Sequence, residues 1–355
     1  MRSQDRFRGC LLGGAAGDAL GYPIEFIGET QIFRRYGPGG ITAYDLQDGI
    51  ALISDDTQMT LFTANGLLLA RASGASYSDA MWHCCQDWLR TQETKYSPAI
   101  RPRYAWLGNI PELYSPRAPG NTCLSALRTD QTRSVQMPVN NSKGCGGVMR
   151  VAPIGLYFND RDVSIEEICR LGAEASAITH GHLLGWMPAA AFVQIIHEVA
   201  EDDASIQDAV RHAMDQVCSM WPESPERSDF MQLMQDAVTL AGQREDDLDA
   251  IHMLGGGWVA EEALAIAVYC ALKYAGDFDR ALIASVNHSG DSDSTGAITG
   301  NILGAQVGLT GIPKKYREHL ELSGLVLEVA DDLWRDAGED DPVWQSKYKA
   351  ITYGR

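Results

Sequence analysis

The sequence lacks an excess of positive charge. It carries 29 Lys and Arg residues against 47 Asp and Glu residues, a formal net charge of −18 at pH 7. A chain this acidic repels the phosphates of nucleic acid and of anionic lipid unless its cations are strongly segregated. We therefore expect no nucleic-acid partner, and we expect bound cations to offset part of the negative charge.

Long hydrophobic runs are also missing. No apolar run approaches the roughly 20 residues that a membrane-spanning helix needs. The first residues, Met1 to Arg6, lead into a glycine-broken segment that does not resemble a secretory signal peptide. The sequence thus predicts a cytoplasmic protein without a membrane partner.

Standard zinc signatures do not occur. The eight cysteines are scattered without a Cys-x-x-Cys pair, and there is no His-Glu-x-x-His. Cys10, Cys85, Cys169 and Cys270 lie in apolar helical patterns, in which a small buried thiol packs well. The sequence predicts reduced, structural cysteines.

Alternating strand patterns are scarce, whereas helical periodicity dominates. Apolar residues recur every three or four positions over residues 57–71, 77–90, 163–176, 183–200, 206–220, 230–241, 259–274 and 325–337. An all-helical enzyme with one large core can reach this length. We predict an all-α protein with a single domain over residues 1–355.

Two segments lie outside the predicted helices. Residues 97–120 carry five of the 14 prolines together with aromatic residues and the cations Arg101, Arg103 and Arg117. A loop this long is more often functional or mobile than idle, although it could be a surface excursion pinned by its aromatic side chains. We expect it to recognise a protein partner. The glycine-rich residues 254–258 could connect two helices or approach a ligand.

Two acidic clusters each precede a helical pattern. They are Ser54-Asp55-Asp56-Thr57 and Asp291-Ser292-Asp293-Ser294-Thr295. Helix capping explains part of each cluster, since Ser and Asp satisfy free N–H groups there. However, two Asp residues with flanking hydroxyls exceed what one cap requires. If the clusters converge, they supply the hard oxygen ligands that Mg²⁺ or Mn²⁺ prefers.

The second cluster allows two other interpretations. It begins like an EF-hand loop, but the twelfth position from Asp291 is Ile302, where a bidentate Glu belongs. It also resembles the nucleophile motif of haloacid-dehalogenase-type phosphatases, with Asp291 as the nucleophile and Asp293 as the general acid. Too few residues follow Asp293 for the rest of that α/β fold, so this phosphatase is the weaker alternative.

A glycine-rich segment follows the pattern of an anion-binding loop. It reads Lys143-Gly144-Cys145-Gly146-Gly147-Val148-Met149-Arg150. Consecutive backbone N–H groups without neighbouring Cβ atoms can bind a phosphate or a diphosphate. No predicted strand precedes the segment, which argues against a dinucleotide-binding fold. On this pattern alone, a tight turn is the simpler interpretation.

Five segments in order resemble the ADP-ribosylglycohydrolase family, which includes the dinitrogenase-reductase-activating glycohydrolases. They are residues 7–21 with Glu25-Phe26, residues 54–59, residues 144–153, Thr179-His180-Gly181-His182, and residues 290–296. The resemblance implies an all-α orthogonal helical bundle with a centre of two divalent cations, Mg²⁺ or Mn²⁺. It also implies cleavage of the glycosidic bond that joins ADP-ribose to a protein or another acceptor.

The same resemblance implies a role for individual residues. The metal ligands would be Ser54, Asp55, Asp56, Asp291, Asp293 and Ser294, with Glu25, Asp56 and Asp293 catalytic. The residues that contact the ligand would be Gly144, Cys145, Gly146, Gly147, Val148 and Met149, which cradle the diphosphate, and His182. For His180, a buried, hydrogen-bonded imidazole is an equally good interpretation. The chain departs from the family at Ser54, where Thr is common, and at Cys145, where Asn is frequent.

The resemblance to the bacterial glycohydrolases implies a protein with arginine-linked ADP-ribose as the substrate. The alternative is a binding or immunity protein that occludes an ADP-ribosyltransferase toxin, with or without hydrolase activity. The intact acidic clusters favour an enzyme, because a pure binder need not retain so many like charges.

Overall fold

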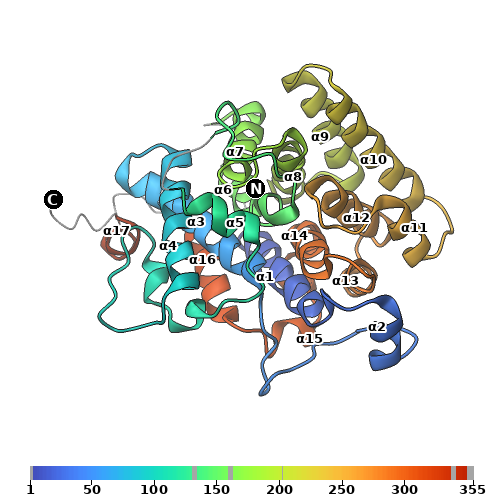
Figure 1. Ribbon diagram of the computed structural model, residues 1–355, viewed down its shortest axis with the longest axis horizontal. Helices are drawn as coiled ribbons and strands as arrows, with labels where there is room; N and C mark the ends of the chain where they lie inside the picture. Colours follow the sequence, from blue (N-terminus) through green and yellow to red (C-terminus); the bar gives the residue numbers. More distant parts are fainter. Residues whose placement is uncertain (1–2, 130–133, 159–162, 202, 337–340, 350–355) are drawn as a thin grey trace.

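The computed structural model describes residues 3–129, 134–158, 163–201, 203–336 and 341–349. In this part of the chain there is no strand, and the β-contacts are isolated bridges, such as that between Gly144 and Val259. The helices run in several directions around one another (Figure 1). The prediction of an all-α orthogonal bundle is confirmed. The phosphatase alternative is wrong, because its α/β fold needs a sheet.

The periodic segments of the sequence coincide with helices. The α-helices are α1 Gln4–Gly21, α2 Glu29–Tyr36, α3 Asp55–Ser73, α4 Tyr77–Glu93, α5 Asn121–Leu127, α6 Ala152–Tyr157, α7 Ile165–Ala177, α8 Leu183–Glu201, α9 Ile206–Met220, α10 Pro225–Ala241, α11 Asp247–Leu254, α12 Ala260–Lys273, α13 Phe278–Val286, α14 Ser292–Gly311, α15 Lys314–Arg317, α16 Ser323–Arg335 and α17 Pro342–Tyr348. Short 3₁₀ helices are η1 Tyr22–Ile24, η2 Trp106–Asn109, η3 Pro111–Tyr114 and η4 Cys145–Gly147. Each of the eight predicted segments falls on one helix, with its ends a few residues away. Residue 337, the end of the last predicted segment, lies outside the described residues.

Helices α1 and α14 pack backbone against backbone. A Cβ atom at Gly17 would come 1.9 Å from the carbonyl oxygen of Gly296, and one at Gly13 would come 2.3 Å from that of Gly300. No other residue type could stand there without moving one helix from the other. This contact places the start of α14 beside the end of α1, and both helix ends carry residues of the candidate site.

Helix α8 is a core helix. It is long and apolar enough to cross a membrane by length and composition, which corrects the expectation that no run comes near that limit. Of its most apolar 18-residue window, 89% is buried inside the protein. A helix that is apolar all round and covered by its neighbours belongs to the interior of a large domain.

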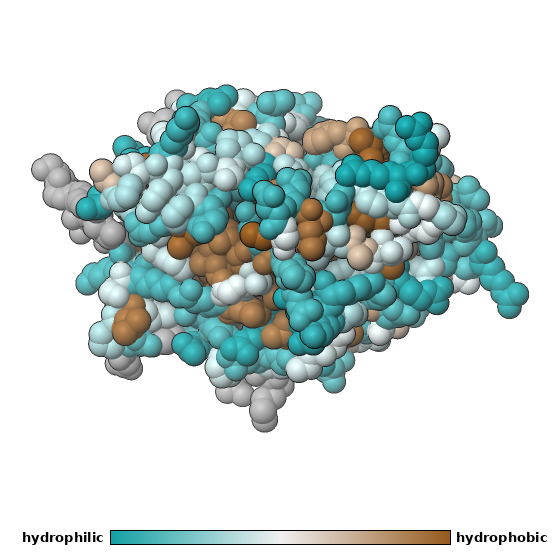
Figure 2. All heavy atoms as spheres, turned by 90° about the horizontal axis from the view of Figure 1, so that it is seen from below, coloured by the Kyte–Doolittle hydropathy of each residue, from teal (hydrophilic) through white to brown (hydrophobic). Residues whose placement is uncertain are grey.

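The surface is mostly hydrophilic, as the net charge of −18 leads one to expect. Figure 2 shows one face, on which apolar side chains are exposed in separate areas among polar ones. The buried apolar side chains of the described residues form one continuous core. This supports the prediction of a single domain, which stays a prediction.

The proline-rich residues 97–120 are anchored to the fold. The carboxylate of Asp87 in α4 accepts hydrogen bonds from the backbone N–H groups of Arg103, Tyr104 and Ala105, at 3.2, 2.6 and 2.8 Å. Leu107 and Leu113, in η2 and η3, are fully buried. The middle of the segment is therefore built into the core, and its beginning is the exposed part.

Candidate active site

A cavity of about 430 Å³ opens where the first turns of α3 and α14 meet η4 and the end of η1. The predicted site residues that line it are Glu25, Asp55, Asp56, Gly144, Cys145, Gly146, Met149, Asp291, Asp293 and Ser294. Ser54, Gly147, Val148 and His182 do not line it. The two acidic clusters, 234 positions apart at their nearest members Thr57 and Asp291, therefore converge on one cavity.

Both capping and clustering explain the acidic segments. Ser54 is the N-cap of α3, and its hydroxyl accepts a hydrogen bond from the N–H of Asp56 at 3.2 Å. Asp291 is the N-cap of α14 and accepts from the N–H of Ser294 at 3.4 Å. Capping uses one residue of each cluster, which leaves Asp55, Asp56 and Asp293 in the first turns, where the helix dipole favours negative charge.

The carboxylates form a buried group that could hold metal. Glu25, Asp291 and Asp293 each offer one oxygen within 4.8 Å of those of the other two. Among the described residues, Glu25 Oε2 and Asp56 Oδ2 are buried without a hydrogen-bond partner. Leaving buried carboxylate oxygens unpartnered is costly unless a cation binds them. This donor set of oxygens fits Mg²⁺ or Mn²⁺.

Burial and mutual repulsion raise the pKa values of the carboxyl groups in this site. Burial, followed by the charge of Asp293, raises the pKa of Glu25 to about 11. The same two causes, in the same order, raise the pKa of Asp55, Asp56 and Asp291 well above the ordinary value for Asp. A bound cation favours the charged form and so offsets this cost.

Asp18 holds the first acidic cluster in place through hydrogen bonds, a role that the sequence motifs did not indicate. Its fully buried carboxylate accepts hydrogen bonds from the N–H of Ser54 at 2.9 Å, from the N–H of Thr57 at 3.1 Å and from the Thr57 hydroxyl. Burial, with the charge of Asp293, raises the pKa of Asp18 to about 7. The signal in the sequence was an Asp in the glycine-rich residues 7–21, whose other charged residue is Arg8.

The glycine-rich segment turns in η4 at the cavity wall. Gly144 and Gly146 face the cavity, whereas a Cβ atom at Gly147 would come 1.9 Å from Ser176 Oγ in α7. The N–H of Cys145 donates to the Trp258 carbonyl at 3.2 Å, which ties the segment to the loop before α12. Gly147 therefore serves packing, and the residues before it are those that face a ligand.

Of the two histidines, His180 and not His182 lines the cavity. Nδ1 of His180 lies 2.9 Å from the Thr179 hydroxyl. Burial, assisted by the charge of Arg150, lowers the pKa of His180 to about 3, so the ring is neutral. Nδ1 of His182 instead accepts from the N–H of Leu184 at 3.0 Å, at the start of α8. The buried, hydrogen-bonded imidazole is confirmed for His180.

An aromatic pair lies at the mouth of the cavity. The rings of Phe26 and Trp258 are stacked, with centroids 5.9 Å apart and planes at 24°. Phe26 is 70% exposed and Trp258 45%, unusually high for large apolar residues. The loop that carries Trp258 is fixed to the acidic cluster by a 2.9 Å hydrogen bond from the N–H of Asp291 to the Gly256 carbonyl. Residues 254–258 lead from the end of α11 toward the start of α12, so the interpretation as a helix connection is confirmed. Trp258 also lines the cavity, and contact with a ligand stays a prediction.

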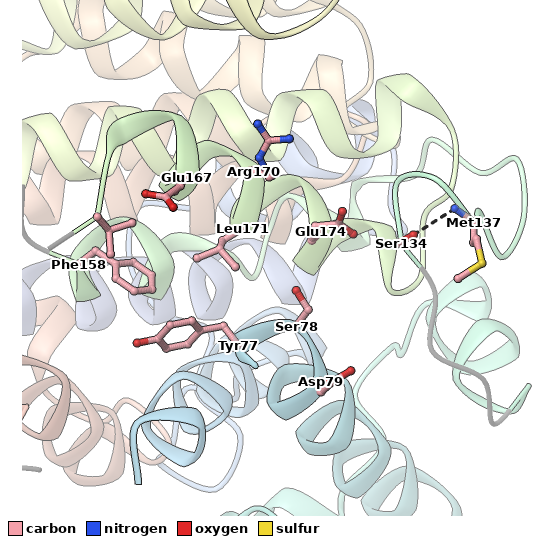
Figure 3. Close-up of a pocket in the computed structure, with 11 residues that line it drawn as sticks. Tyr77, Ser78, Asp79, Ser134, Met137, Phe158, Glu167, Arg170, Leu171 and Glu174 are labelled. Carbon is pink, nitrogen blue, oxygen red and sulfur yellow. Dashed lines mark hydrogen bonds between the residues drawn. The ribbon is translucent and has the colours of Figure 1, made fainter. Parts of the chain in front are cut away.

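A larger cavity lies elsewhere, between the start of α4 and α7 (Figure 3). Its volume is about 580 Å³, and Tyr77, Phe158 and Leu171 contribute apolar surface to it. Its carboxylates are already engaged: Glu167 completes the capping box of α7, and Glu174 accepts from the N–H of Val135 at 3.1 Å. Since none of the predicted site residues lines it, the smaller cavity is the candidate active site.

Known proteins are similar in sequence to nearly the whole chain. The chain is 24% identical to the ADP-ribosylhydrolase ARH3 of Bos taurus, over 90% of each protein. It is 23% identical to the ADP-ribosylarginine hydrolase Tri1 of Pseudomonas putida, over 99% of this chain and 82% of that one. It is 24% identical to the ADP-ribosyl-[dinitrogen reductase] glycohydrolase of Rhodospirillum rubrum, over 90% of this chain and 91% of that one.

A solved structure, described as an ADP-ribosylglycohydrolase-related protein complex, has the same fold. It superposes with a TM-score of 0.63 at 21% identity, covering 94% of this chain and 98% of that one. The family model for ADP-ribosylglycohydrolase matches residues 1–342. Since that match spans both acidic clusters and the glycine-rich segment, the protein is an enzyme that belongs to the ADP-ribosylglycohydrolase family.

Proposed function

We propose that the protein is a hydrolase dependent on two divalent cations, Mg²⁺ or Mn²⁺, that removes ADP-ribose from modified protein side chains. The observation that carries the proposal is the convergence of Glu25, Asp55, Asp56, Asp291 and Asp293 on one cavity. Arginine-linked ADP-ribose is the preferred substrate. Two of the relatives support this preference, since one is named for ADP-ribosylarginine and the other for modified dinitrogen reductase.

The cations would be held by the carboxylates and hydroxyls of the two acidic clusters, namely Ser54, Asp55, Asp56, Asp291, Asp293 and Ser294. The Ser54 hydroxyl lies outside the cavity lining and accepts a hydrogen bond from the N–H of Asp56, one of the other proposed ligands. When bound, the cations supply charge that orients the ribose hydroxyls and a water and polarises the reacting centre. The unpartnered oxygens of Glu25 and Asp56 are the observation that supports this fit.

Glu25 is the residue to which we assign proton transfer. Hydrolysis adds water at the anomeric carbon, breaks the glycosidic bond and leaves one proton on the departing acceptor. Glu25 lines the cavity, and its Oε2 has no hydrogen-bond partner among the described residues, so this carboxyl group is available to give or take such a proton. Gly144, Gly146 and Met149, which line the same cavity, would hold the diphosphate.

The test is release of ADP-ribose from arginine-, serine- and nucleic-acid-linked substrates, after metal removal by EDTA and after adding Mg²⁺ or Mn²⁺. We expect release from the arginine-linked substrate, and only with added cation. Release of serine-linked but not arginine-linked ADP-ribose would refute the substrate preference. Tight binding of a toxin without release from any substrate would favour the occlusion alternative instead.

A further inference from the structure

The candidate site contains a sulfur atom among its oxygens. Cys145, in η4, lines the cavity, and its thiol donates a hydrogen bond to Asp291 Oδ2 across 2.6 Å. The other cysteine that lines the cavity is Cys123, whose Sγ lies 3.9 Å from an Arg150 nitrogen and 4.0 Å from the Gly146 carbonyl oxygen. Cys145 is therefore the cysteine whose sulfur contacts a carboxylate of the site.

A second observation points to a cation at this place. Asp56 lines the same cavity and is 3% exposed, yet its Oδ2 has no hydrogen-bond partner among the described residues. Cys145, Asp56 and Asp291 all line this cavity. A thiol and a carboxylate in contact, beside an unpartnered carboxylate oxygen, form a mixed sulfur and oxygen donor set.

The kind of donor decides which cations bind tightly. Mg²⁺ and Mn²⁺ prefer oxygen ligands and gain little from sulfur, whereas a thiolate selects softer cations such as Zn²⁺. Cd²⁺, which is softer still, is bound by thiolates for the same reason. Zn²⁺ also exceeds Mn²⁺ in affinity at most sites built from such ligands. A thiol at residue 145 thus shifts the selectivity of the centre toward softer cations.

We propose that Cys145 makes the carboxylate centre a binding site for a thiophilic divalent cation, Zn²⁺ or Cd²⁺, which Cys145 Sγ and Asp291 hold in place of a hard cation. The thiol proton passes to solvent when the sulfur coordinates. Because the same carboxylates would hold Mg²⁺ or Mn²⁺, such a cation competes with them and inhibits the enzyme. This inference rests on the proposed function, since it places both kinds of cation in one centre.

The experiment uses Cd²⁺, because a thiolate bound to Cd²⁺ gives a charge-transfer absorption in the ultraviolet. All proteins carry Cys218→Ser, which removes the cysteine that the structure exposes. The parent, Cys145→Ser and Cys123→Ser are titrated with CdCl₂ after metal removal, without substrate. Circular dichroism confirms that each variant is folded. Cys123→Ser is the matched control, because it removes a sulfur from the same cavity without touching a carboxylate.

We expect the absorption in the parent and in Cys123→Ser, and its loss in Cys145→Ser. In the parent, added Mg²⁺ or Mn²⁺ should shift the Cd²⁺ midpoint upward, and Asp291→Asn should weaken Cd²⁺ binding at least about tenfold. Absorption that persists in Cys145→Ser, or a parent that binds Cd²⁺ without it, would overturn the inference.

The Cd²⁺ titration with added Mg²⁺ or Mn²⁺ uses the parent protein, so it does not depend on whether the variants at Cys145 and Cys123 fold. Hydrolysis is measured separately, with Mg²⁺ or Mn²⁺. Hydrolysis without any Cd²⁺–sulfur absorption would overturn this inference and leave the proposed function standing. Absorption without hydrolysis under any cation would support this inference and overturn the proposed function.

Discussion

Glu29 Oε1 lies 2.6 Å from Nε2 of His252. The same oxygen accepts hydrogen bonds from the backbone N–H and the hydroxyl of Ser289, both at 3.1 Å. Glu29 begins α2, His252 lies in the last turn of α11, and Ser289 precedes Asp291 by two residues. One carboxylate thus fastens the segment that follows Glu25 to two loops that reach the candidate site.

We predict that Glu29→Gln lowers kcat/KM for ADP-ribose release by roughly tenfold, because charge-assisted hydrogen bonds contribute about 1.5–3 kcal/mol and hold the Glu25 segment in place. Glu166→Gln, which breaks an exposed ion pair with Arg170 within α7, is the matched control and should leave the rate unchanged. Equal rates for both variants would show that Glu29 does not position Glu25.

The pH dependence of this contact has a definite sign. Partial burial raises the pKa of Glu29, but hydrogen bonds from His252 and Ser289 outweigh it and hold the pKa below the ordinary value for Glu. A carboxyl with a lowered pKa stabilises the fold above its unfolded pKa, and this contribution disappears as the pH falls through the folded value. The difference in unfolding free energy between wild type and Glu29→Gln should therefore be constant near neutral pH and shrink below about pH 4.

Divalent cations should stabilise the protein more at higher pH. Burial and Asp293 raise the pKa of Asp55, Asp56 and Asp291, so their effect on stability has the opposite sign to that of Glu29. In the metal-free protein, these three carboxyl groups contribute their full stabilisation below the ordinary carboxyl pKa. This stabilisation is lost as the pH rises through their pKa values in the folded state. Mg²⁺ or Mn²⁺ at 100 times its dissociation constant adds about 2.7 kcal/mol.

Thermal unfolding with and without Mn²⁺, at pH 5 and pH 8, measures this effect. We expect the increase in Tm on adding Mn²⁺ to be larger at pH 8, where the uncompensated carboxylates cost most. An equal increase at both pH values, or none, would mean that these carboxylates do not bind the cation.

Eight of the helices could be predicted from the sequence because their signal is local, and α1 was not among them. Apolar spacing located α3, α4 and α8 within a few residues, since packing one face against a core is what holds a helix in a large domain. The same local rule identified Ser54 and Asp291 as helix starts. It could not show that α1 and α14 touch through their glycines, because that contact joins residues almost 300 positions apart.

Those residues of the candidate site that belong to a sequence motif could be predicted. Those that only the packing of the fold brings to the site were missed. The two acidic clusters were found because several acidic residues stand together. Asp18 was missed because one Asp in an apolar helix gives no pattern. His180 and His182 belong to one motif, and their sequence does not show which ring faces the cavity; the resemblance implied His182. In the structure His180 lines the cavity, whereas the ring of His182 accepts a hydrogen bond from the N–H of Leu184.

Glu25→Gln should lower kcat strongly and change the affinity for ADP-ribose little. The amide keeps the shape of the side chain but cannot give or take a proton, and general acid catalysis typically contributes about 10²–10⁴-fold. Single-turnover rates and ADP-ribose binding by calorimetry separate the two effects. Wild-type turnover in this variant would remove Glu25 from the mechanism.

Asp293→Asn should abolish turnover while stabilising the metal-free fold. The Asp293 charge raises the pKa of every other carboxylate in the cluster, so its removal relieves their repulsion by at least about 1 kcal/mol at pH 8. Urea unfolding of the EDTA-treated proteins measures this, with Asp236→Asn, an exposed position on α10, as the control. A metal-free Asp293→Asn protein less stable than wild type would show that the cluster is not under electrostatic strain.

The proline-rich residues 97–120 divide into a part that serves the site and a part that is free to meet a partner. At the end of the segment, the Arg117 carbonyl accepts from the N–H of Asp55 at 3.0 Å, and the N–H of Gly120 donates to Asp55 Oδ2 at 3.2 Å. Replacing residues 117–120 would therefore disturb the candidate metal ligands. The exposed beginning, residues 97–101, makes no such contact among the described residues.

Replacing residues 97–101 by a Gly-Ser segment of equal length should lower the rate on an ADP-ribosylated protein and leave that on free ADP-ribosyl-arginine unchanged. The replacement removes Pro98 and the cation Arg101, and the flexible chain must lose more entropy when it meets a partner. It keeps the hydrogen bonds of Asp87 to residues 103–105, so the core around η2 stays in place. Equal loss on both substrates would place this segment in the catalytic cavity, and no loss on either would make it a surface excursion without a role in recognition.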